Sequence, residues 1–453
     1  MTRQLQRARL AQWRDPAAVY AELAAEAVAA VWLDAGPYAT DGLSYIGIPS
    51  TAPLTESVEH GDVTIFERLR AALEHDSAVD TTVAREDGFA LGWVGWFGYE
   101  LASHTAGVPT SEAATPDAAF VYLDWALEFD HEFRTCDLIL LGSHDECARK
   151  LGNLETQLAD ALPPTPLPAS AVTPERVRWR HSATRYQELV LACLAAITAG
   201  DAYQLCLTNE VHVSGEFTAL EVYLRLRQEN PSHHGGLLLI GGVALLSSSP
   251  EVFLRVDASG HLTTKPIKGT RARSHDQALD DALAAELISS DKERAENLMI
   301  VDLMRNDVGR VAELGSVHVD TLLEVESYEN VHQLVSTVSA QLAAGFSAVD
   351  AIEVCFPAGS MTGAPKISAM NILHKLEQGP RGMYAGAFGY LGIDGTANLA
   401  MVIRSIVLTS QGASIGTGGG ITSGSIPQAE LEETWVKVAP LLRALGVEST
   451  EYS

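Results

Sequence analysis

The spacing of apolar residues alternates along the chain between the period of a helix and that of a strand. Apolar positions recur every three or four residues over 289–311, which predicts a helix, and residues 182–201 and 425–445 are also expected to be helical. Stretches such as GFALGWVGWFGYEL, AAFVYLDWALEFD and AYQLCLTNEVHV read as strands bounded by turn residues. Helices and strands alternate too irregularly for a doubly wound sheet, so the pattern indicates a mixed α/β fold.

A proline-rich segment interrupts this pattern. Residues 161–177, ALPPTPLPASAVTPERV, contain five prolines and few large apolar residues. Such a composition is typical of a linker or a surface crossover. We therefore expect an N-terminal region over residues 1–165 and a catalytic domain over residues 178–453.

Charge and cysteine content exclude several classes of function. The chain has 453 residues and a formal net charge of −27, which argues against nucleic acid or an anionic membrane as a general partner. No apolar leader is visible at the N-terminus, and the longest apolar run, GGLLLIGGVALL, is too short to span a bilayer. The five cysteines lie far apart and form no CxxC pair, so we expect no disulfide framework, no structural zinc and a cytoplasmic location.

Carboxylates on two predicted helices are candidate metal ligands. Glu296 lies on the apolar stripe of the 289–311 helix, where it either forms a salt bridge in the core, the more common arrangement, or binds a metal ion. In the last helix, which Ser425 is expected to cap, Glu433 and Lys437 have the spacing of an ordinary surface pair. Alternatively, Glu430 and Glu433 project into a cleft and bind Mg²⁺, which prefers carboxylate oxygens.

Three further features each have two interpretations. The segment IGTGGGITSGS, before the last helix, is either a flexible loop or a nest of N–H groups for an anion. Arg404, which ends the predicted strand NLAMVIRSIVL, is either the partner of a buried carboxylate or a clamp for a substrate carboxylate. Lys268, in LTTKPIKGTRARS, is either a surface charge or a nucleophile. No GxGxxG motif opens a helix in the first βα unit and no P-loop motif is present, so nucleotide sites lose their main support.

Six segments, in order and spacing, resemble those of the chorismate-utilising enzymes, over roughly residues 180 to 440. They are SPEVFLRV, PIKGTR, AENLMIVDLMRNDVGRV, FPAGSMTGAPKISAM, YAGAFGYLG…IRSIVL and GTGGGITSGSIPQAELEET. This family includes anthranilate synthase component I, aminodeoxychorismate synthase component I, and isochorismate and salicylate synthases. The resemblance implies an α/β sandwich of two antiparallel sheets packed face to face, with helices outside and the active site between the sheets.

Two positions distinguish members of the family. Lys268 in PIKGT is similar to the aminodeoxychorismate synthases, whereas anthranilate synthases have Ala there. Gln204 occupies the position of a water-activating Lys in isochorismate and salicylate synthases, and an amide cannot act as that base. The resemblance therefore implies conversion of chorismate and ammonia to 4-amino-4-deoxychorismate, for 4-aminobenzoate and folate synthesis. The alternatives are anthranilate synthase component I and a non-catalytic paralogue that acts as a binding partner.

The resemblance also implies roles for individual residues. Lys268 matches the nucleophile, Glu251 the general acid, and Glu296, Glu430 and Glu433 the Mg²⁺ site. The positions expected to contact substrate are Thr270, His332, Ser360, Tyr384, Arg404, Gly418, Gly419, Gly420 and Lys437. Because neither end of the chain shows a triad-like Cys/His arrangement, ammonia is expected from a separate glutamine amidotransferase subunit. Cys206 departs from the Asn common in relatives, and Ala35 from the usual Ser.

Overall fold

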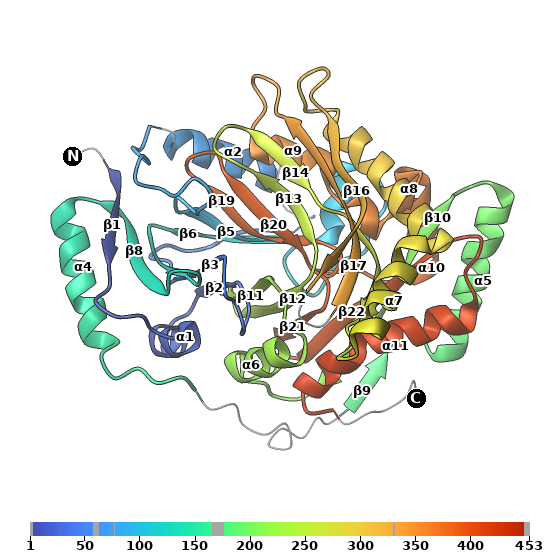
Figure 1. Cartoon of the computed structure of the whole chain (residues 1–453), viewed down its shortest axis with the longest axis horizontal. Helices are drawn as coiled ribbons and strands as arrows, with labels where there is room; N and C mark the ends of the chain where they lie inside the picture. The colour runs from blue at the N-terminus through green and yellow to red at the C-terminus, as the bar shows by residue number, and fades with distance from the viewer. Residues whose placement is uncertain (1–2, 58–62, 77, 165–175, 329–330, 448–453) are drawn as a thin grey trace.

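Two antiparallel sheets form the centre of the molecule, with helices around them (Figure 1). The computed structural model describes residues 3–57, 63–76, 78–164, 176–328 and 331–447. Within these residues the helices are α1 (Pro16–Ala24), α2 (Ile65–Asp76), α3 (Ala102–Thr105), α4 (His144–Gln157), α5 (Ala183–Ala199), α6 (Ala219–Glu229), α7 (Gln277–Ser289), α8 (Asp291–Val308), α9 (Ala348–Cys355), α10 (Lys366–Glu377) and α11 (Pro427–Ala444). This arrangement confirms the predicted sandwich.

The first sheet contains twelve strands in the described part of the chain. In spatial order these are β1 (Gln4–Arg9), β8 (Thr135–Gly142), β7 (Trp125–Asp130), β3 (Leu43–Gly47), β2 (Ala30–Asp34), β11 (His234–Ile240), β12 (Val243–Ser249), β21 (Ser405–Thr409), β22 (Gly412–Ile421), β10 (Gln204–Ser214) and β18 (Gly363–Ala364), with β9 (Arg176–Trp179) beside β10.

The second sheet contains ten described strands. Their order is β15 (Ile267–Ala272), β17 (Val331–Gln341), β14 (His261–Thr264), β13 (Val252–Val256), β20 (Ala397–Met401), β19 (Ala387–Gly392), β5 (Gly92–Phe97), β6 (Ala118–Leu123) and β4 (Leu54–Glu56), with β16 (His318–Ser327) beside β17.

Strand periodicity explains why the two sheets pack on each other. Val94 and Trp96 of β5 belong to an apolar cluster that also contains Leu238 of β11, so this cluster lies between the sheets. Phe97, the next residue of β5, belongs instead to a cluster with residues of α2 and α9. Because successive side chains of a strand point to opposite faces, one strand supplies both the inter-sheet core and the surface under the helices.

The N-terminal region and the expected catalytic domain share both sheets. Strand β2 pairs with β11 in the first sheet, and β5 pairs with β19 in the second. The two segments of sequence are therefore interleaved in space. Most of the proline-rich segment, residues 165–175, lies outside the described residues.

Two of the points at which the chain passes from one sheet to the other are neighbours in space. Between β12 and β13 it crosses at Pro250 and Glu251, and between β20 and β21 it crosses at residues 402–404. The predicted continuous strand NLAMVIRSIVL is thus two strands in different sheets. Arg404 has a left-handed φ of 51°, so the backbone turns here, between β20 in one sheet and β21 in the other. The backbone N–H of Met401 donates to the carbonyl of Glu251 at 3.0 Å, so the two crossings are joined.

The helix predictions agree with the structure, apart from one cap. Helix α8 begins after Ser290, whose hydroxyl accepts from the backbone of Glu293. In α11, however, the N-cap is Ile426, with Pro427 in the first turn. The Ser425 hydroxyl accepts from the backbone N–H of Thr422 instead, so it closes the preceding turn and does not cap the helix.

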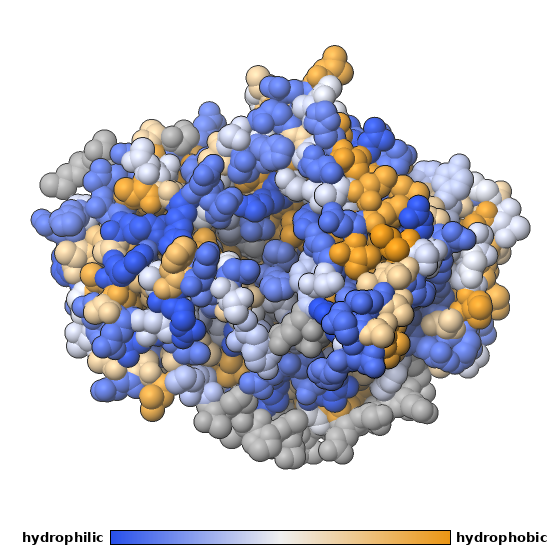
Figure 2. Space-filling view, in the orientation of Figure 1, coloured by the Kyte–Doolittle hydropathy of each residue, from blue (hydrophilic) through white to orange (hydrophobic). Residues whose placement is uncertain are grey.

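The face seen in Figure 2 is mostly hydrophilic, with one apolar area over α7, α8 and β16. Leu279, Leu298 and Leu322 on these elements are 54%, 43% and 51% exposed. Helix α8 therefore exposes apolar residues on its outer face while it buries Ile300 and Met304 on its inner face. None of the described helices combines the length and the apolar character needed to cross a membrane.

A buried ion pair connects α10 to the strand that lines the site. Arg381 donates to Glu377 at 2.6 and 2.9 Å and to the carbonyls of Met361 and Cys206. Replacing Arg381 by Met leaves the Glu377 carboxylate buried without its main partner, so we expect a loss of about 3–5 kcal/mol in the free energy of unfolding. Urea denaturation measures this loss.

The control for this prediction is Arg185→Met. Arg185 pairs with Glu188 at 2.9 Å, but both side chains are about half exposed. Removal of that pair is expected to change the free energy of unfolding by no more than about 0.5 kcal/mol. Equal effects of the two substitutions would contradict the assigned importance of the buried pair.

Candidate active site

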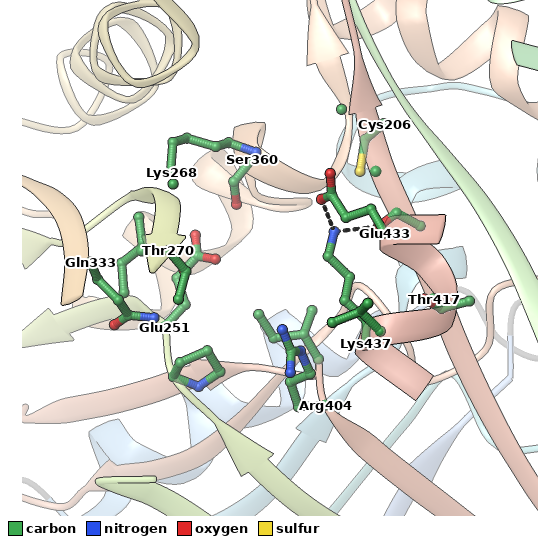
Figure 3. A pocket seen from close by; sticks show the side chains of 18 of the residues that line it. Cys206, Glu251, Lys268, Thr270, Gln333, Ser360, Arg404, Thr417, Glu433 and Lys437 are labelled. Carbon is green, nitrogen blue, oxygen red and sulfur yellow. Dashed lines mark hydrogen bonds and ion pairs between the residues drawn. The ribbon is translucent and has the colours of Figure 1, made fainter. Parts of the chain in front are cut away.

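A cavity of about 570 Å³ lies where the two sheet crossings meet β15, β17, β22, α8 and α11. Most of the residues predicted for the site lie on its walls: Glu251, Lys268, Thr270, Glu296, Ser360, Tyr384, Arg404, Gly418, Gly419, Gly420, Glu433 and Lys437. Two predicted residues, Glu430 and His332, do not line it. Figure 3 shows several of the lining side chains.

Lys268 projects into the cavity from an irregular part of β15. The register of β15 with β17 shifts between Ile267 and Thr270, and Gly269 between them has a φ of 80°. Such a bulge turns a side chain out of the regular alternation. Lys268 is half-buried and, in Figure 3, extends toward Ser360. The structure therefore excludes the interpretation of Lys268 as an ordinary surface charge.

The environment of Lys268 favours its charged form. Burial lowers the pKa of the amine, but the negative charges that Cys206, Glu296 and Glu251 carry when they are ionised outweigh this effect, and the pKa is raised above its usual value. Lys268 therefore carries a proton in the ligand-free protein at neutral pH. A nucleophilic amine must be neutral, so Lys268 is not in its reactive form without ligands.

Glu251 has the opposite preference, for its neutral form. The side chain is buried at the first sheet crossing, and this burial raises the pKa of its carboxyl group, although Lys268 and the hydrogen bond with Ser360 act against the rise. A carboxylic acid that keeps its proton at higher pH than usual can donate it to a ligand in the cavity.

Arg404 is held at the second sheet crossing with its guanidinium group on the cavity wall. No ion pair joins it to a carboxylate within the described residues, although Glu433 is close enough to favour its charge. Burial lowers the pKa of Arg404, but a guanidinium group stays charged at physiological pH. The described residues therefore do not support the interpretation as a buried ion pair, and the clamp for a substrate carboxylate stays a prediction.

Residues 415–421 of the glycine-rich segment form the end of strand β22, so the flexible-loop interpretation is wrong for them, whereas residues 422–425 lie in the turn that precedes α11. The interpretation as a nest of N–H groups for an anion stays a prediction. Residues 416–420 lie within β22 and pair with β10, with Gly420 opposite Cys206. A side chain at Gly416 would collide with the ring of Tyr384, and one at Gly418 with the backbone of Leu207. The glycines therefore let Tyr384 and the neighbouring strand approach closely.

Three carboxylates converge beside this strand. A Cβ atom added at Gly419 would lie 3.0 Å from Glu430 Oε2 and 4.0 Å from Glu433 Oε1, and one added at Gly420 would lie 3.8 Å from Glu296 Oε2. Glu430 is thus buried behind Gly419, which explains why it does not line the cavity. The lack of side chains at these glycines leaves room beside the carboxylates.

Lysines neutralise part of this carboxylate cluster, defined as Glu296, Glu430 and Glu433. Lys437 donates to Glu433 at 2.7 Å, and Lys292 lies 3.5 Å from Glu430 and 4.0 Å from Glu296. Burial, which tends to raise the pKa of Glu433, is outweighed by Lys437, so this pKa is lowered. Burial dominates at Glu296 and raises its pKa to about 7.

The carboxylate cluster fits a magnesium ion in its chemistry but is not assembled as a finished metal site. Among the described residues, no three acidic, Cys or His side chains are arranged to hold an ion together. Oε1 of Glu296 is nevertheless buried without a hydrogen-bond partner in this part of the chain, so it can accept a ligand. Carboxylate oxygens are the donors that Mg²⁺ prefers, and the ion usually keeps several waters.

The structure places His332 away from the cavity. Its neighbours in β17, Val331 and Gln333, line the cavity, so His332 points to the opposite face of the strand. There its ring contacts Asp280 at 3.0 Å and Ser327 at 2.7 Å. The expected pocket position of His332 is therefore corrected to a buried polar contact with α7.

The sequence analysis did not predict two residues of the site, and it did not predict the burial of a third. Gln333 lines the cavity, and strand alternation would have identified it had His332 been assigned to the other face. Lys292 lies one turn before Glu296, a spacing that allows contact on a helix. Gln204 is fully buried, both polar atoms of its amide have no described hydrogen-bond partner, and Gly420 provides the space it fills.

Comparisons with known proteins agree with this geometry. The chain is 40% identical to an aminodeoxychorismate synthase of Streptomyces pristinaespiralis, over 95% of this chain and 64% of that protein. It is 46% identical to an aminodeoxychorismate synthase of Streptomyces griseus, over 86% of this chain and 55% of that protein. The chain thus spans less than two thirds of the length of these relatives.

A solved structure and a family match complete the comparison. Anthranilate synthase component I from Streptococcus pneumoniae superposes with a TM-score of 0.76 at 29% identity, over 89% of this chain and 93% of that one. Residues 29–443 match the family described as chorismate binding enzyme, and this match includes both sheet crossings and every wall of the cavity. The protein therefore belongs to the chorismate binding enzyme family.

Proposed function

We propose that the protein is an aminodeoxychorismate synthase, which converts chorismate and ammonia to 4-amino-4-deoxychorismate and water. The observation that carries this proposal is the position of Lys268, in the sequence PIKGT, on the wall of a cavity that also contains the buried acid Glu251. The names of the two Streptomyces relatives support the same activity.

The first half of the reaction removes the 4-hydroxyl group, which is a poor leaving group. The neutral amine of Lys268 attacks C2 of the ring, the electron pairs of the diene shift toward C4, and the C4–O bond breaks. Glu251 gives its proton to the departing oxygen, which leaves as water. The products of this step are a covalent lysine adduct, with its nitrogen as an ammonium, and the Glu251 carboxylate.

The second half restores the ring and both side chains. Ammonia attacks C4, the electron pairs shift back, and the C2–N bond breaks so that Lys268 leaves as a neutral amine. The new ammonium group at C4 gives one proton to Glu251. The sum of both halves is chorismate plus ammonia giving aminodeoxychorismate plus water, with no other reagent.

Substrate orientation is assigned to the charged and aromatic residues around the two side chains. Chorismate carries two carboxylates, and the guanidinium group of Arg404, with no described ion-pair partner, can grip one of them through two hydrogen bonds. Tyr384 lies against Gly416 at the same wall. Thr270, Ser360 and Lys437 add hydroxyl and amine donors to the cavity.

The carboxylate cluster is the proposed magnesium site. Magnesium at Glu296, Glu430 and Glu433 would bind a ring carboxylate and offset negative charges that help keep Lys268 protonated. Lys437 holds Glu433 in place, and the close approach at Gly419 fixes the position of Glu430.

Ammonia is proposed to come from a glutamine amidotransferase subunit, and the product to enter 4-aminobenzoate and folate synthesis. The curated relatives are longer than the chain, which is consistent with additional machinery in those proteins. All five cysteines are buried and free. Free thiols support a reducing, cytoplasmic setting for this activity.

Product analysis tests the proposed activity directly. Purified protein with chorismate, Mg²⁺ and an ammonium salt at mildly alkaline pH is expected to form a compound that aminodeoxychorismate lyase converts to 4-aminobenzoate. The same mixture without ammonium is the control and should give none. Formation of fluorescent anthranilate before the lyase is added would indicate the alternative, an anthranilate synthase.

Substitution of Lys268 tests covalent catalysis. Lys268→Met and Lys268→Arg are both expected to lower turnover by about three orders of magnitude or more, because neither side chain can form the adduct. The Arg variant keeps the positive charge and so separates nucleophilic attack from electrostatic binding. Substantial activity in that variant would contradict the mechanism, and intact-mass measurement of the wild type with chorismate alone should detect the adduct.

The pH dependence of the reaction tests Glu251. Its raised pKa keeps the acid protonated up to higher pH than usual, so the rate at constant free ammonia should fall as the pH rises through that pKa. Glu251→Gln is expected to lower turnover by about 10² to 10⁴-fold and to abolish this alkaline limb, with little change in KM for chorismate. An alkaline limb that persists in the Gln variant would assign it to another group.

A further inference from the structure

Lys292 is placed where a helix alone would not favour it. It lies in the first turn of α8, two residues after the N-cap Ser290, and the partial positive charge at a helix N-terminus disfavours a cation there. Its amine contacts two members of the carboxylate cluster, Glu430 at 3.5 Å and Glu296 at 4.0 Å. These acidic partners, on α11 and on α8 itself, account for its orientation.

The two carboxylates are buried and depend on a nearby positive charge, whereas Lys292 is about half exposed to solvent. Glu430 and Glu296 are 2% and 8% exposed, and Oε1 of Glu296 has no hydrogen-bond partner within the described residues. Buried carboxylates without a counter-ion are costly. Lys292 remains 47% exposed, so its flexible stem can move its amine into solvent at little cost in buried contacts.

The other amines near the cluster differ from Lys292 in their contacts. Lys437 contacts Glu433 at 2.7 Å and donates to the carbonyl of Gly418, also at 2.7 Å. Lys268, on β15, forms no ion pair within 4.0 Å in the part of the chain that the structure describes. Lys292 is the amine in contact with two members of the cluster and also exposed to solvent.

We propose that Lys292 is the resident counter-ion of the carboxylate cluster, and that a divalent cation must displace its ammonium group to bind. This inference rests on the proposed function for the location of the metal site. Its consequence is a lower metal affinity of the substrate-free protein than the three carboxylates would otherwise give. A positive charge about 4 Å from a divalent ion weakens binding by about tenfold or more, even with the screening of water.

Metal binding without substrate tests the displacement. Mn²⁺ is a suitable probe because the electron paramagnetic resonance signal of the free ion is lost on binding, so the Kd is measured without any enzyme assay. Lys292→Met keeps the length of the side chain and removes the charge, and we expect it to tighten Mn²⁺ binding by about tenfold or more. Lys292→Gln should act in the same direction.

A matched lysine provides the control. Lys265 also pairs with a glutamate, Glu326, at 2.8 Å and is 35% exposed, but it does not line the cavity. Lys265→Met is expected to leave the Kd for Mn²⁺ unchanged. Thermal unfolding of each variant confirms that it is folded before the titration.

Two failures can be told apart with Glu296→Gln, which should weaken Mn²⁺ binding if the metal site is where we place it. Unchanged or weaker binding in Lys292→Met, while Glu296→Gln is weakened, would overturn the role of Lys292 alone. If Glu296→Gln binds like the wild type, or if neither the wild type nor Lys292→Met binds Mn²⁺, the metal site itself is wrong and the inference falls with it.

Discussion

The site depends on two adjacent places where the chain leaves one sheet and enters the other. The crossings at Pro250–Glu251 and at residues 402–404 are adjacent, and the backbone of Met401 donates to the carbonyl of Glu251 to join them. An acid and a guanidinium group are thereby fixed between the sheets, away from the regular strand faces. Lys268 approaches from β15 and the carboxylate cluster from α8 and α11. Without the crossings these elements would not share a cavity.

The sequence predicted elements well wherever one periodicity extended over many residues. The stripe of α8 and the alternating apolar residues of β10 extend far enough to decide between helix and strand. The sheet crossings were not predicted, because NLAMVIRSIVL has no local signal that assigns its two halves to different sheets. The pairing of β2 with β11 joins residues some 200 positions apart, which local patterns do not encode.

The candidate site was predicted mainly from motifs. The predictions that were wrong concern the direction in which a side chain points or the role of a backbone segment. His332 is within a motif, but strand parity turns it toward Asp280 and away from the cavity. The glycine run was expected to be a flexible loop or an anion nest, whereas here it is part of a strand and allows Tyr384 and β10 to approach closely. In both cases the motif lies beside the cavity, but the packing of neighbouring elements determines which side chains and backbone groups face it.

The charges of the cavity connect its two proposed functions, metal binding and covalent catalysis. Cys206 and the carboxylates that face Lys268 raise the pKa of its amine, so the ligand-free protein holds its nucleophile as a cation. Among those groups, Glu296 and Glu433 also belong to the carboxylate cluster, where Lys292 and Lys437 supply the compensating charge. In the proposed mechanism, neutralising the cluster reduces the effect that keeps Lys268 protonated. Under this proposal, Lys268 would lose its proton more easily when a cation is bound at the cluster, because the glutamates that would bind the cation are the same ones that raise the pKa of the lysine.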